Sequence, residues 1–235
     1  MDRRCIVVTG SSSGIGKSIA AELLESGAMV VGIARDHSKF SPDSSNYWPH
    51  QVDLANLGKL PNVISDITLK HPNIDGFISN AGYGEFKALE NYSPSQAISF
   101  LNTNLLSHII LTKGLLPTIK RSKKFGNLIF IGSEAALRGS RKGTLYNASK
   151  FGLRGFAQAL REETSNSNVS VTIINPGMVR TNFFDKLDFR PGDHPSNSIE
   201  PSDISELVLN ILRARKGTVI DEINLSPLKK VIKFD

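Results

Sequence analysis

Cysteine is nearly absent from this 235-residue sequence, in which Cys5 is the only one. A single cysteine cannot form an internal disulfide or a cysteine-rich zinc site, so a small disulfide-stabilised secreted fold is excluded and no metal site is expected. The N-terminal apolar run, residues 5–8, is too short for the core of a signal peptide or for a membrane span. These absences predict a cytoplasmic protein with no membrane partner.

Aromatic side chains are also few, at 7% of the chain. Lysine and arginine number 28 against 22 aspartate and glutamate, which gives a net charge of +6. The basic residues lie in small scattered groups, such as Arg121, Lys123 and Lys124, without interleaved aromatics or a known nucleic-acid motif. We therefore interpret them as solvated helix ends and expect no nucleic-acid partner.

What the chain does contain is ordinary for a globular protein, with 40% apolar residues, 21% charged residues and 19 glycines. Domains average roughly 150 residues, and single α/β domains of this length are common. No linker or low-complexity tract divides the sequence. We therefore expect one domain over residues 1–235.

Short apolar runs alternate with stretches of helical spacing. After the first run, Ile15, Ile19 and Leu23 recur at helical spacing, and Gly27 follows where a left-handed helix cap is expected. Ser93 to Gln96 reads Ser-Pro-Ser-Gln, a capping box that predicts a helix to about residue 120. This alternation is typical of an α/β fold in which helices cover both faces of a doubly wound parallel sheet. The expected strands are 5–9, 28–33, 51–52, 76–78, 128–131, 169–174 and 220–225.

Two segments rich in turn-forming residues are expected to be loops, one over 35–49 and one over 182–201. The second is longer than most connections in compact domains, and long loops of this kind are commonly active-site lids. We therefore expect a substrate lid over about 182–200.

A glycine-rich turn, Thr-Gly-Ser-Ser-Ser-Gly-Ile-Gly over residues 9–16, joins the first expected strand to the first expected helix. Glycines let the backbone turn sharply and approach a pyrophosphate, while the helix N-terminus offers free N–H groups to the anion. A glycine-rich turn alone is weak evidence, but its place inside a βαβ unit favours dinucleotide binding.

The spacing T-G-x-x-x-G-x-G resembles the short-chain dehydrogenase/reductase family, and further motifs of that family follow in order. Asn80-Ala81-Gly82 follows an expected strand, Tyr146 and Lys150 form Y-x-x-x-K, and Ser133 stands thirteen residues before Tyr146. Pro176 to Thr181 matches the P-G-x-V-x-T region, and Asn104 falls in the long helix. The resemblance spans essentially the whole chain. It implies a Rossmann-type fold and an oxidoreductase that uses a nicotinamide cofactor.

The expected chemistry centres on Tyr146 and Lys150, which lie at i and i+4 on one helix face. An ammonium group near the phenol favours phenolate and is expected to lower the tyrosine pKa towards neutrality. Tyr146 would then exchange a proton with the substrate oxygen while Ser133 hydrogen-bonds the same oxygen. The resemblance implies that Lys150 also binds the nicotinamide ribose and that Asn104 holds a water in the proton relay.

The cofactor preference depends on where the second strand ends, in the sequence Ala34-Arg35-Asp36. Arginine after the strand neutralises the 2′-phosphate of NADP, whereas an acidic residue pairs with the ribose hydroxyls of NAD. We expect NADP(H) through Arg35, and NAD(H) stays possible if the strand ends later, at Asp36. The expected cofactor-binding residues are Gly10, Ser12, Ser13, Gly14, Ile15, Gly16, Arg35, Asp53, Leu54, Asn80, Ala81, Gly82, Tyr146, Lys150, Pro176, Gly177, Val179 and Thr181.

The expected substrate is a small molecule with a carbonyl or secondary alcohol, held by Ser133 and Tyr146 beside an apolar lining. Glu134 has two interpretations, a pocket residue or a solvated carboxylate. The same holds for three basic residues, which either attract an acidic substrate or are exposed loop charges. The expected apolar lining is Met178, Phe183, Phe184 and Tyr83, and the three basic residues are Arg138, Arg141 and Lys142.

Two alternative functions stay open. One is a catalytically silent cofactor-binding sensor or scaffold. The other is a nucleotide-sugar epimerase or dehydratase, although such enzymes usually have different glycine spacing and a longer C-terminal region. Close-packing glycines and apolar bulk in the helix over 145–163 predict a homodimer or homotetramer.

Overall fold

Seven parallel strands form the centre of the computed structural model, which describes Met1 and residues 4–234. Their order across the sheet is β3-β2-β1-β4-β5-β6-β8. The expected doubly wound α/β fold is therefore confirmed. The strands are β1 (Cys5–Thr9), β2 (Met29–Ala34), β3 (Tyr47–Gln51), β4 (Gly76–Ser79), β5 (Gly126–Ile131), β6 (Val169–Pro176) and β8 (Glu222–Leu225).

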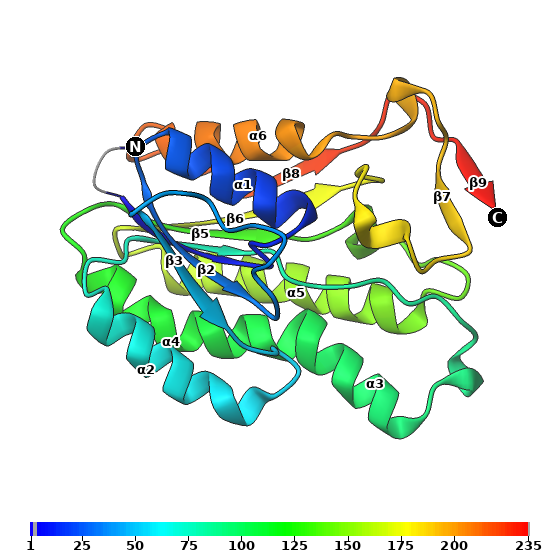
Figure 1. Ribbon diagram of the computed structural model, residues 1–235, viewed down its shortest axis with the longest axis horizontal. Coiled ribbons are helices and arrows are strands. Elements are labelled where there is room, and N and C mark those ends of the chain that lie inside the picture. The colour runs from blue at the N-terminus through cyan, green and yellow to red at the C-terminus, as the bar shows by residue number, and fades with distance from the viewer. Residues whose placement is uncertain (2–3, 235) are drawn as a thin grey trace.

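Helices cover both faces of this sheet, with α1 and α6 on one side and α2, α4 and α5 on the other (Figure 1). Side chains alternate along the strands, so Ile6 and Val8 pack in the core under α1 and α6 while Val7 packs in the opposite core. Both faces of the strands are consequently apolar, as a covered parallel sheet requires. The helices are α1 (Gly14–Glu25), α2 (Leu60–Lys70), α3 (Pro94–Leu101), α4 (Ser107–Arg121), α5 (Thr144–Glu163) and α6 (Pro201–Arg213).

The third strand differs from the expected one, because β3 covers Tyr47–Gln51 instead of 51–52. Its sequence contains Pro49, and three of its five residues are exposed, so it shows no apolar run. A proline is tolerated here because β3 is the edge of the sheet, where one side of the strand needs no backbone donor. The expected loop over 35–49 therefore ends before Tyr47.

The long helix expected from Ser93 does begin with the predicted capping box, in which Ser93 and Gln96 each accept a hydrogen bond from the other's backbone N–H. It is interrupted, however, by a π-helical turn at Asn102–Leu106 that separates α3 from α4. Pro117 lies inside α4. The cap of α1 is also as expected, since Gly27 has a φ of +81°.

The segment over 182–200 is more ordered than the loop that the sequence predicts. It contains β7 (Phe189–Pro191), which pairs antiparallel with β9 (Ile232–Phe234) at the end of the chain (Figure 1). The sequence analysis did not predict either strand. Backbone hydrogen bonds from Gly192 N to Val231 O and from Lys229 N to Ser196 O extend the pairing, each at 2.9 Å. The C-terminal segment therefore lies along this loop and holds it.

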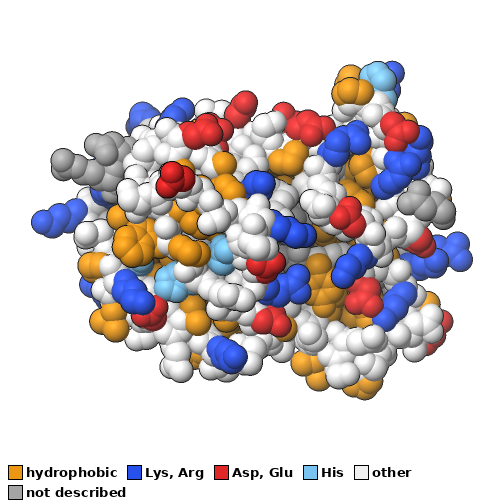
Figure 2. Space-filling view, viewed as in Figure 1, with side chains coloured by type: hydrophobic (Ala, Val, Ile, Leu, Met, Phe, Trp, Pro, Cys, Tyr) orange, Lys and Arg blue, Asp and Glu red, His pale blue; other side chains and the backbone are white. Residues whose placement is uncertain are grey.

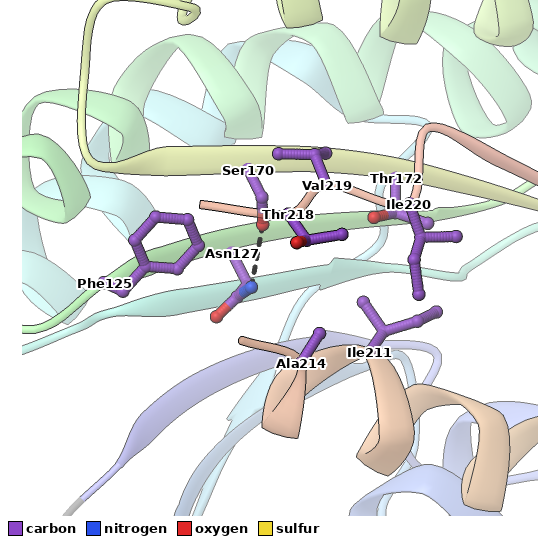
Figure 3. A pocket seen from close by; sticks show the side chains of 9 residues that line it. All are labelled: Phe125, Asn127, Ser170, Thr172, Ile211, Ala214, Thr218, Val219 and Ile220. Atoms are coloured by element: carbon purple, nitrogen blue, oxygen red, sulfur yellow. Dashed lines mark hydrogen bonds between the residues drawn. The ribbon is translucent and has the colours of Figure 1, made fainter. Parts of the chain in front are cut away.

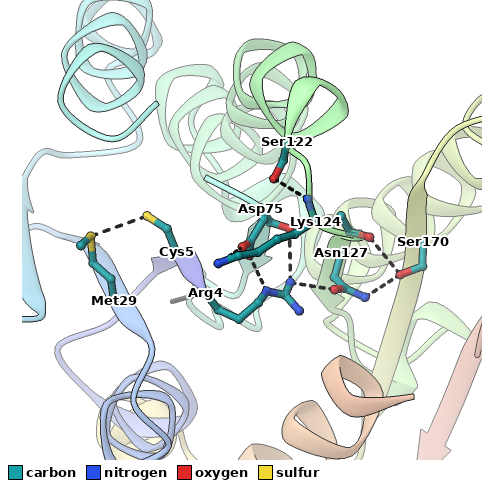
Figure 4. A network of polar contacts seen from close by, with 9 residues as sticks. Arg4, Cys5, Met29, Asp75, Ser122, Lys124, Asn127 and Ser170 are labelled. Atoms are coloured by element: carbon teal, nitrogen blue, oxygen red, sulfur yellow. Dashed lines mark hydrogen bonds and ion pairs between the residues drawn. The ribbon is translucent and has the colours of Figure 1, made fainter. Parts of the chain in front are cut away.

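A polar network ties the strands together at the amino-terminal edge of the sheet (Figure 4). The carboxylate of Asp75 is fully buried between Arg4 Nε at 2.5 Å and Lys124 Nζ at 3.4 Å. Arg4 also donates to Asn127 Oδ1 at 2.8 Å, and Asn127 donates to Ser170 Oγ at the same distance. Buried charges need such partners because desolvation is costly. The network thus links the starts of β1, β4, β5 and β6.

Within the described residues, no helix is long and apolar enough to cross a membrane. The same part of the chain holds no cluster of three or more His, Cys, Asp or Glu side chains suited to a metal ion.

Candidate active site

The glycine-rich turn lies at the carboxyl end of β1, next to the loop that follows β4. Gly10 has a φ of +68°, and a Cβ there would lie 2.8 Å from Asn80 Nδ2. A Cβ at Gly16 would lie 2.2 Å from Gly10 O, so the turn packs directly on the first turn of α1. Thr9 Oγ1 accepts hydrogen bonds from the backbone N–H groups of Asn80 and Ala81 at 2.9 and 3.0 Å. The turn and the Asn80–Gly82 motif thus form one unit.

The N-terminus of α1 is open to an anion. Ser13 at the N-cap makes no side-chain cap hydrogen bond, and the first turn contains no acidic residue. By contrast, the N-terminus of α3 is closed by its capping box. A Cβ at Gly14 would lie 3.4 Å from the Thr181 side chain, so the 176–181 segment borders the same turn. Free N–H groups in a glycine cradle fit the pyrophosphate of a dinucleotide.

The second strand ends at Ala34, one residue beyond the expected strand over 28–33 and two residues before Asp36. Arg35 is the first residue beyond it and is exposed. The carboxylate of Asp36 accepts hydrogen bonds from the backbone N–H and the hydroxyl of Ser38, both at 2.8 Å, and these hold the pKa of Asp36 below its usual value. Asp36 is therefore occupied in a local turn, whereas Arg35 is presented at the strand end.

Asp53 and Leu54, the two cofactor-binding residues expected after β3, differ in burial. Asp53 is exposed and accepts a hydrogen bond from Ala55 N at 3.0 Å. Leu54 is 5% exposed and belongs to the core under α2 and α4. Any contact of Leu54 with a ligand would therefore involve its backbone.

Ser133, Tyr146 and Lys150 come together beyond the carboxyl end of β5. Ser133 is the second residue after the end of β5, and its side chain hydrogen-bonds the phenol of Tyr146. Lys150 Nζ lies 5.8 Å from the centroid of the Tyr146 ring and donates to Ile131 O at 3.1 Å. The helix α5 presents both side chains from one face, as the i, i+4 spacing predicts.

Burial changes the proton affinities of this pair. It raises the pKa of Tyr146 to about 12, although the Ser133 hydrogen bond acts in the opposite direction, and it lowers the pKa of Lys150 to about 8. The expectation that Lys150 lowers the Tyr146 pKa is therefore not met in this structure. The reason is physical: desolvation of the phenol dominates, and the ammonium group is directed to the Ile131 carbonyl.

Asn104 lies in the π-helical turn and is completely buried. Its Oδ1 accepts from Tyr83 N at 3.1 Å, and its Nδ2 donates to Tyr83 O at 2.8 Å. An amide can make further hydrogen bonds through its second N–H and its second lone pair. Asn104 therefore holds the loop after β4 through its two hydrogen bonds to the Tyr83 backbone. Only its second N–H and its second lone pair are left to bind a water.

A histidine that the sequence analysis missed lies behind Lys150. His108 of α4 is fully buried, and its Nδ1 is hydrogen-bonded to Ser79 Oγ. Burial and the nearby Lys150 charge lower the pKa of His108 to about 3, so it is neutral at physiological pH. No local sequence pattern indicates His108 as part of the site, because residues 80–107 separate it from its hydrogen-bond partner Ser79.

The expected apolar lining is only partly assembled around Tyr146. The Phe183 ring lies 5.9 Å from the Tyr146 ring, and Phe184 packs on Phe183 at 5.2 Å. Tyr83 instead packs on buried Phe100 at 5.0 Å. Met178 is half-buried, and its backbone carbonyl accepts from Ile199.

Phe86 is a neighbour of Tyr146 that the sequence analysis missed, with ring centroids 5.1 Å apart. The signal that was available is its place in the loop directly after the Asn80–Gly82 motif. Glu134 forms an ion pair with Lys230 at 2.6 Å, so neither of its two expected roles describes it fully. The basic residues Arg138, Arg141 and Lys142 are exposed.

Two cavities lie at the other edge of the sheet. One of about 10 Å³ lies beside Asn127 and Ser170, near the amino-terminal ends of β5 and β6, and has room for about one water (Figure 3). The other, of about 400 Å³, borders Arg4, Cys5 and His71. Neither is lined by the residues expected to carry the chemistry, because aromatic rings cover Tyr146 at the carboxyl edge.

Comparison with known proteins agrees with this geometry. A family model described as short chain dehydrogenase matches residues 4–190. The chain is 33% identical over 192 residues to the 3-oxoacyl-(acyl-carrier-protein) reductase of Buchnera aphidicola, which covers 80% of this chain and 78% of that protein. It is 30% identical to the NADP-dependent 3-hydroxy acid dehydrogenase of Schizosaccharomyces pombe, over 97% of this chain and 93% of that protein.

Among solved structures, a metagenomic short-chain oxidoreductase in complex with NADP is similar, with a TM-score of 0.83 and 27% identity over 96% of this chain and 97% of that one. Family model, relatives and fold agree over most of the chain. The chain therefore belongs to the short-chain dehydrogenase family and is an oxidoreductase that acts on CH–OH groups with NAD(P).

Proposed function

We propose that this protein is an NADP(H)-dependent oxidoreductase that interconverts a carbonyl and a secondary alcohol on a small molecule. The observation that carries the proposal is the meeting of Ser133, Tyr146 and Lys150 at the same sheet edge as an uncapped, glycine-lined helix N-terminus. Ligands of open α/β sheets bind at this edge, where the chain reverses direction across the sheet, here between β1 and β4.

The dinucleotide would be held by the glycine turn, with its pyrophosphate at the N-terminus of α1 and Arg35 at its 2′-phosphate. The preference for NADP(H) is supported by exposed Arg35 and occupied Asp36, and by two NADP-named relatives. Lys150 would donate to the nicotinamide ribose. When bound, the reduced cofactor supplies the hydride.

The protein's own side chains carry out the proton transfer of the reaction. Tyr146 donates its hydroxyl proton to the carbonyl oxygen of the substrate as the carbonyl carbon accepts a hydride, and Ser133 hydrogen-bonds the same oxygen. Lys150 would stabilise the phenolate that remains once its ammonium group, here directed to Ile131 O, faces the phenol. Asn104 fixes the loop that carries Tyr83 and assists proton return through a water at its remaining hydrogen-bonding sites.

The segment over 182–200 acts as the substrate lid in this proposal, because it brings Phe183 against Tyr146. We also propose that copies of the chain associate through α5. Phe151 is 44% exposed on this helix, and a Cβ at Gly155 would meet nothing within 4 Å, so another helix has room to approach there.

The variant Tyr146→Phe tests the proposed mechanism against the catalytically silent alternative. We expect this variant to lose about a hundredfold in kcat, because it removes the proton donor, and to bind NADPH within about threefold of the unchanged protein. The measurement is NADPH oxidation over a panel of ketones and aldehydes, together with the NADPH dissociation constant. Retention of more than about a tenth of kcat would contradict the mechanism, and no turnover by the unchanged protein would favour the silent alternative.

A further inference from the structure

Five phenylalanine rings form a continuous contact chain beside Tyr146. They come from three separate parts of the chain: the loop after β4, the segment over 182–200 and the C-terminal strand β9. Phe86 lies 5.1 Å from Phe189, Phe184 lies 5.9 Å from Phe189, and Phe189 lies 6.5 Å from Phe234, all between ring centroids. The chain holds 12 phenylalanines, so nearly half of them gather at this one place. The five are Phe86, Phe183, Phe184, Phe189 and Phe234.

These rings are not part of the hydrophobic core. Within the described residues, neither of the two core clusters that sandwich the sheet includes any of the five. Four of the rings are half-buried, and Phe234 is 75% exposed. They pack on one another and on the catalytic tyrosine, so they form an apolar wall over the reacting atoms.

Three ion pairs lie beside this wall. Glu134, next to Ser133, pairs with Lys230 at 2.6 Å, and Lys87 pairs with Glu85 at 2.7 Å. Asp193 of the lid segment pairs with Lys233 of β9. Figure 2 shows the same mixture, with acidic and basic side chains interspersed at the end of the molecule where β7 and β9 lie. A substrate carboxylate that approached Lys87, Lys230 or Lys233 would therefore have to displace an existing ion pair.

We infer that the preferred substrate is an uncharged ketone or aldehyde with an aromatic substituent, which packs against Phe86 and Phe183 with its carbonyl at Tyr146. This inference rests on the proposed function. Aromatic rings pack well in tilted and edge-to-face arrangements, and the present contacts of Tyr146 with Phe86 and Phe183 have tilts of 50° and 58°. In the reduction, the carbonyl carbon gains the hydride of NADPH and the oxygen gains the Tyr146 proton, so the product is the alcohol and NADP⁺.

The test compares three ketones that differ in ring and charge. Acetophenone has an uncharged aromatic ring, 4-acetylbenzoate has a ring with a carboxylate, and butanone has no ring. We expect kcat/KM to be highest for acetophenone, by about tenfold over each of the others, because only acetophenone supplies a ring without a charge. Equal or better use of 4-acetylbenzoate would overturn the inference. Turnover of butanone alone would support the proposed function while rejecting this substrate class.

Variants of the wall provide the second arm. Phe86→Ala and Phe183→Leu are each expected to lower kcat/KM for acetophenone by about tenfold and for butanone by less than about threefold. Phe125→Ala is the matched control, because Phe125 is also half-buried but borders the small cavity at the opposite edge of the sheet. An equal loss for both ketones would show that the rings only support the fold. NADPH affinity within about threefold of the unchanged protein verifies that each variant is folded.

Discussion

Single residues at this site have roles that depend on their surroundings more than on their type. Burial keeps Tyr146, the proposed proton donor, protonated, whereas the same burial lowers the pKa of the Lys150 ammonium group to about 8. Arg35 and Asp36 are neighbours of opposite charge, but only Asp36 is engaged by a local hydrogen-bonded turn.

One prediction at this scale concerns Arg35→Ala. A charge-assisted hydrogen bond contributes on the order of 1.5 to 3 kcal/mol, so the variant should bind NADPH roughly ten- to a hundredfold more weakly and NADH nearly as before. The measurement is kcat/KM with each cofactor. Asp36→Asn is the control, and it should leave the ratio of the two cofactors nearly unchanged. A natural preference for NADH would contradict the placement of Arg35 at the 2′-phosphate.

A second prediction concerns pH. Because burial lowers the pKa of Lys150 from 10.5 to about 8, its charge is present below pH 8 and is lost as pH rises through that value. NADPH affinity should fall over the same range. The pKa of His108 is about 3 and that of Tyr146 is about 12, so neither titrates between pH 6.5 and 9.5.

Two variants separate Lys150 from other causes of this pH dependence. Lys150→Arg keeps its charge over the whole range and should remove the decrease. Lys150→Ala should bind weakly at every pH. A decrease that persists in both variants would assign it to another group.

At the scale of elements, the C-terminal segment acts on the lid segment. β9 pairs with β7, Asn197 Nδ2 donates to Lys229 O at 3.2 Å, and Gly177 N donates to Leu225 O at 2.8 Å. These contacts hold the stretch that carries Phe183 and Phe189. A two-stranded ribbon is marginal by itself, so its strength comes from these additional contacts.

Removal of residues 226–235 should therefore loosen the lid segment without unfolding the sheet. We expect trypsin to cut after Lys186 at least about tenfold faster in the truncated chain, because backbone hydrogen bonds that protect the segment are lost. Lys230→Met is the control. It removes only a partly exposed ion pair, which contributes about 0.5 kcal/mol, and should change the cleavage rate little. Unchanged cleavage of the truncated chain would show that the segment holds itself in place.

At the scale of the whole molecule, the buried ion pairs and the proposed active site lie at opposite ends of the strands. The buried Asp75 ion pairs lie at the amino-terminal edge, while the glycine turn and Tyr146 lie at the carboxyl edge. The outer surface of α5 is left for association. The proposed association depends on exposed apolar side chains there: Phe151 of α5, and Leu106 of the π-helical turn, which is 40% exposed.

The association predicts a dimer or tetramer by light scattering at micromolar concentration. Phe151→Asp should shift the protein towards monomer, because burying a carboxylate at a helix interface is costly. Glu206→Lys in α6, on the opposite side of the sheet, is the control for a charge change at another exposed helical position. A monomer for the unchanged protein would contradict the association.

Local sequence patterns determined the elements and the cofactor turn of this protein. The glycine spacing in 9–16, the cap at Gly27 and the capping box at Ser93 each depend on residues close together in the chain, so their backbone consequences can be predicted. The i, i+4 spacing of Tyr146 and Lys150 is equally local. The apolar run over 28–33 likewise placed the end of β2 to within one residue of Ala34.

Only the tertiary structure decided what surrounds those residues. Phe86, Phe189 and Phe234 are far apart in the sequence, and their meeting beside Tyr146 depends on the pairing of β7 with β9. The proton affinities depend on the same packing, because desolvation is set by every group that excludes water from the phenol and the ammonium. A sequence fixes which groups are present, but distances and burial arise from contacts across the whole chain.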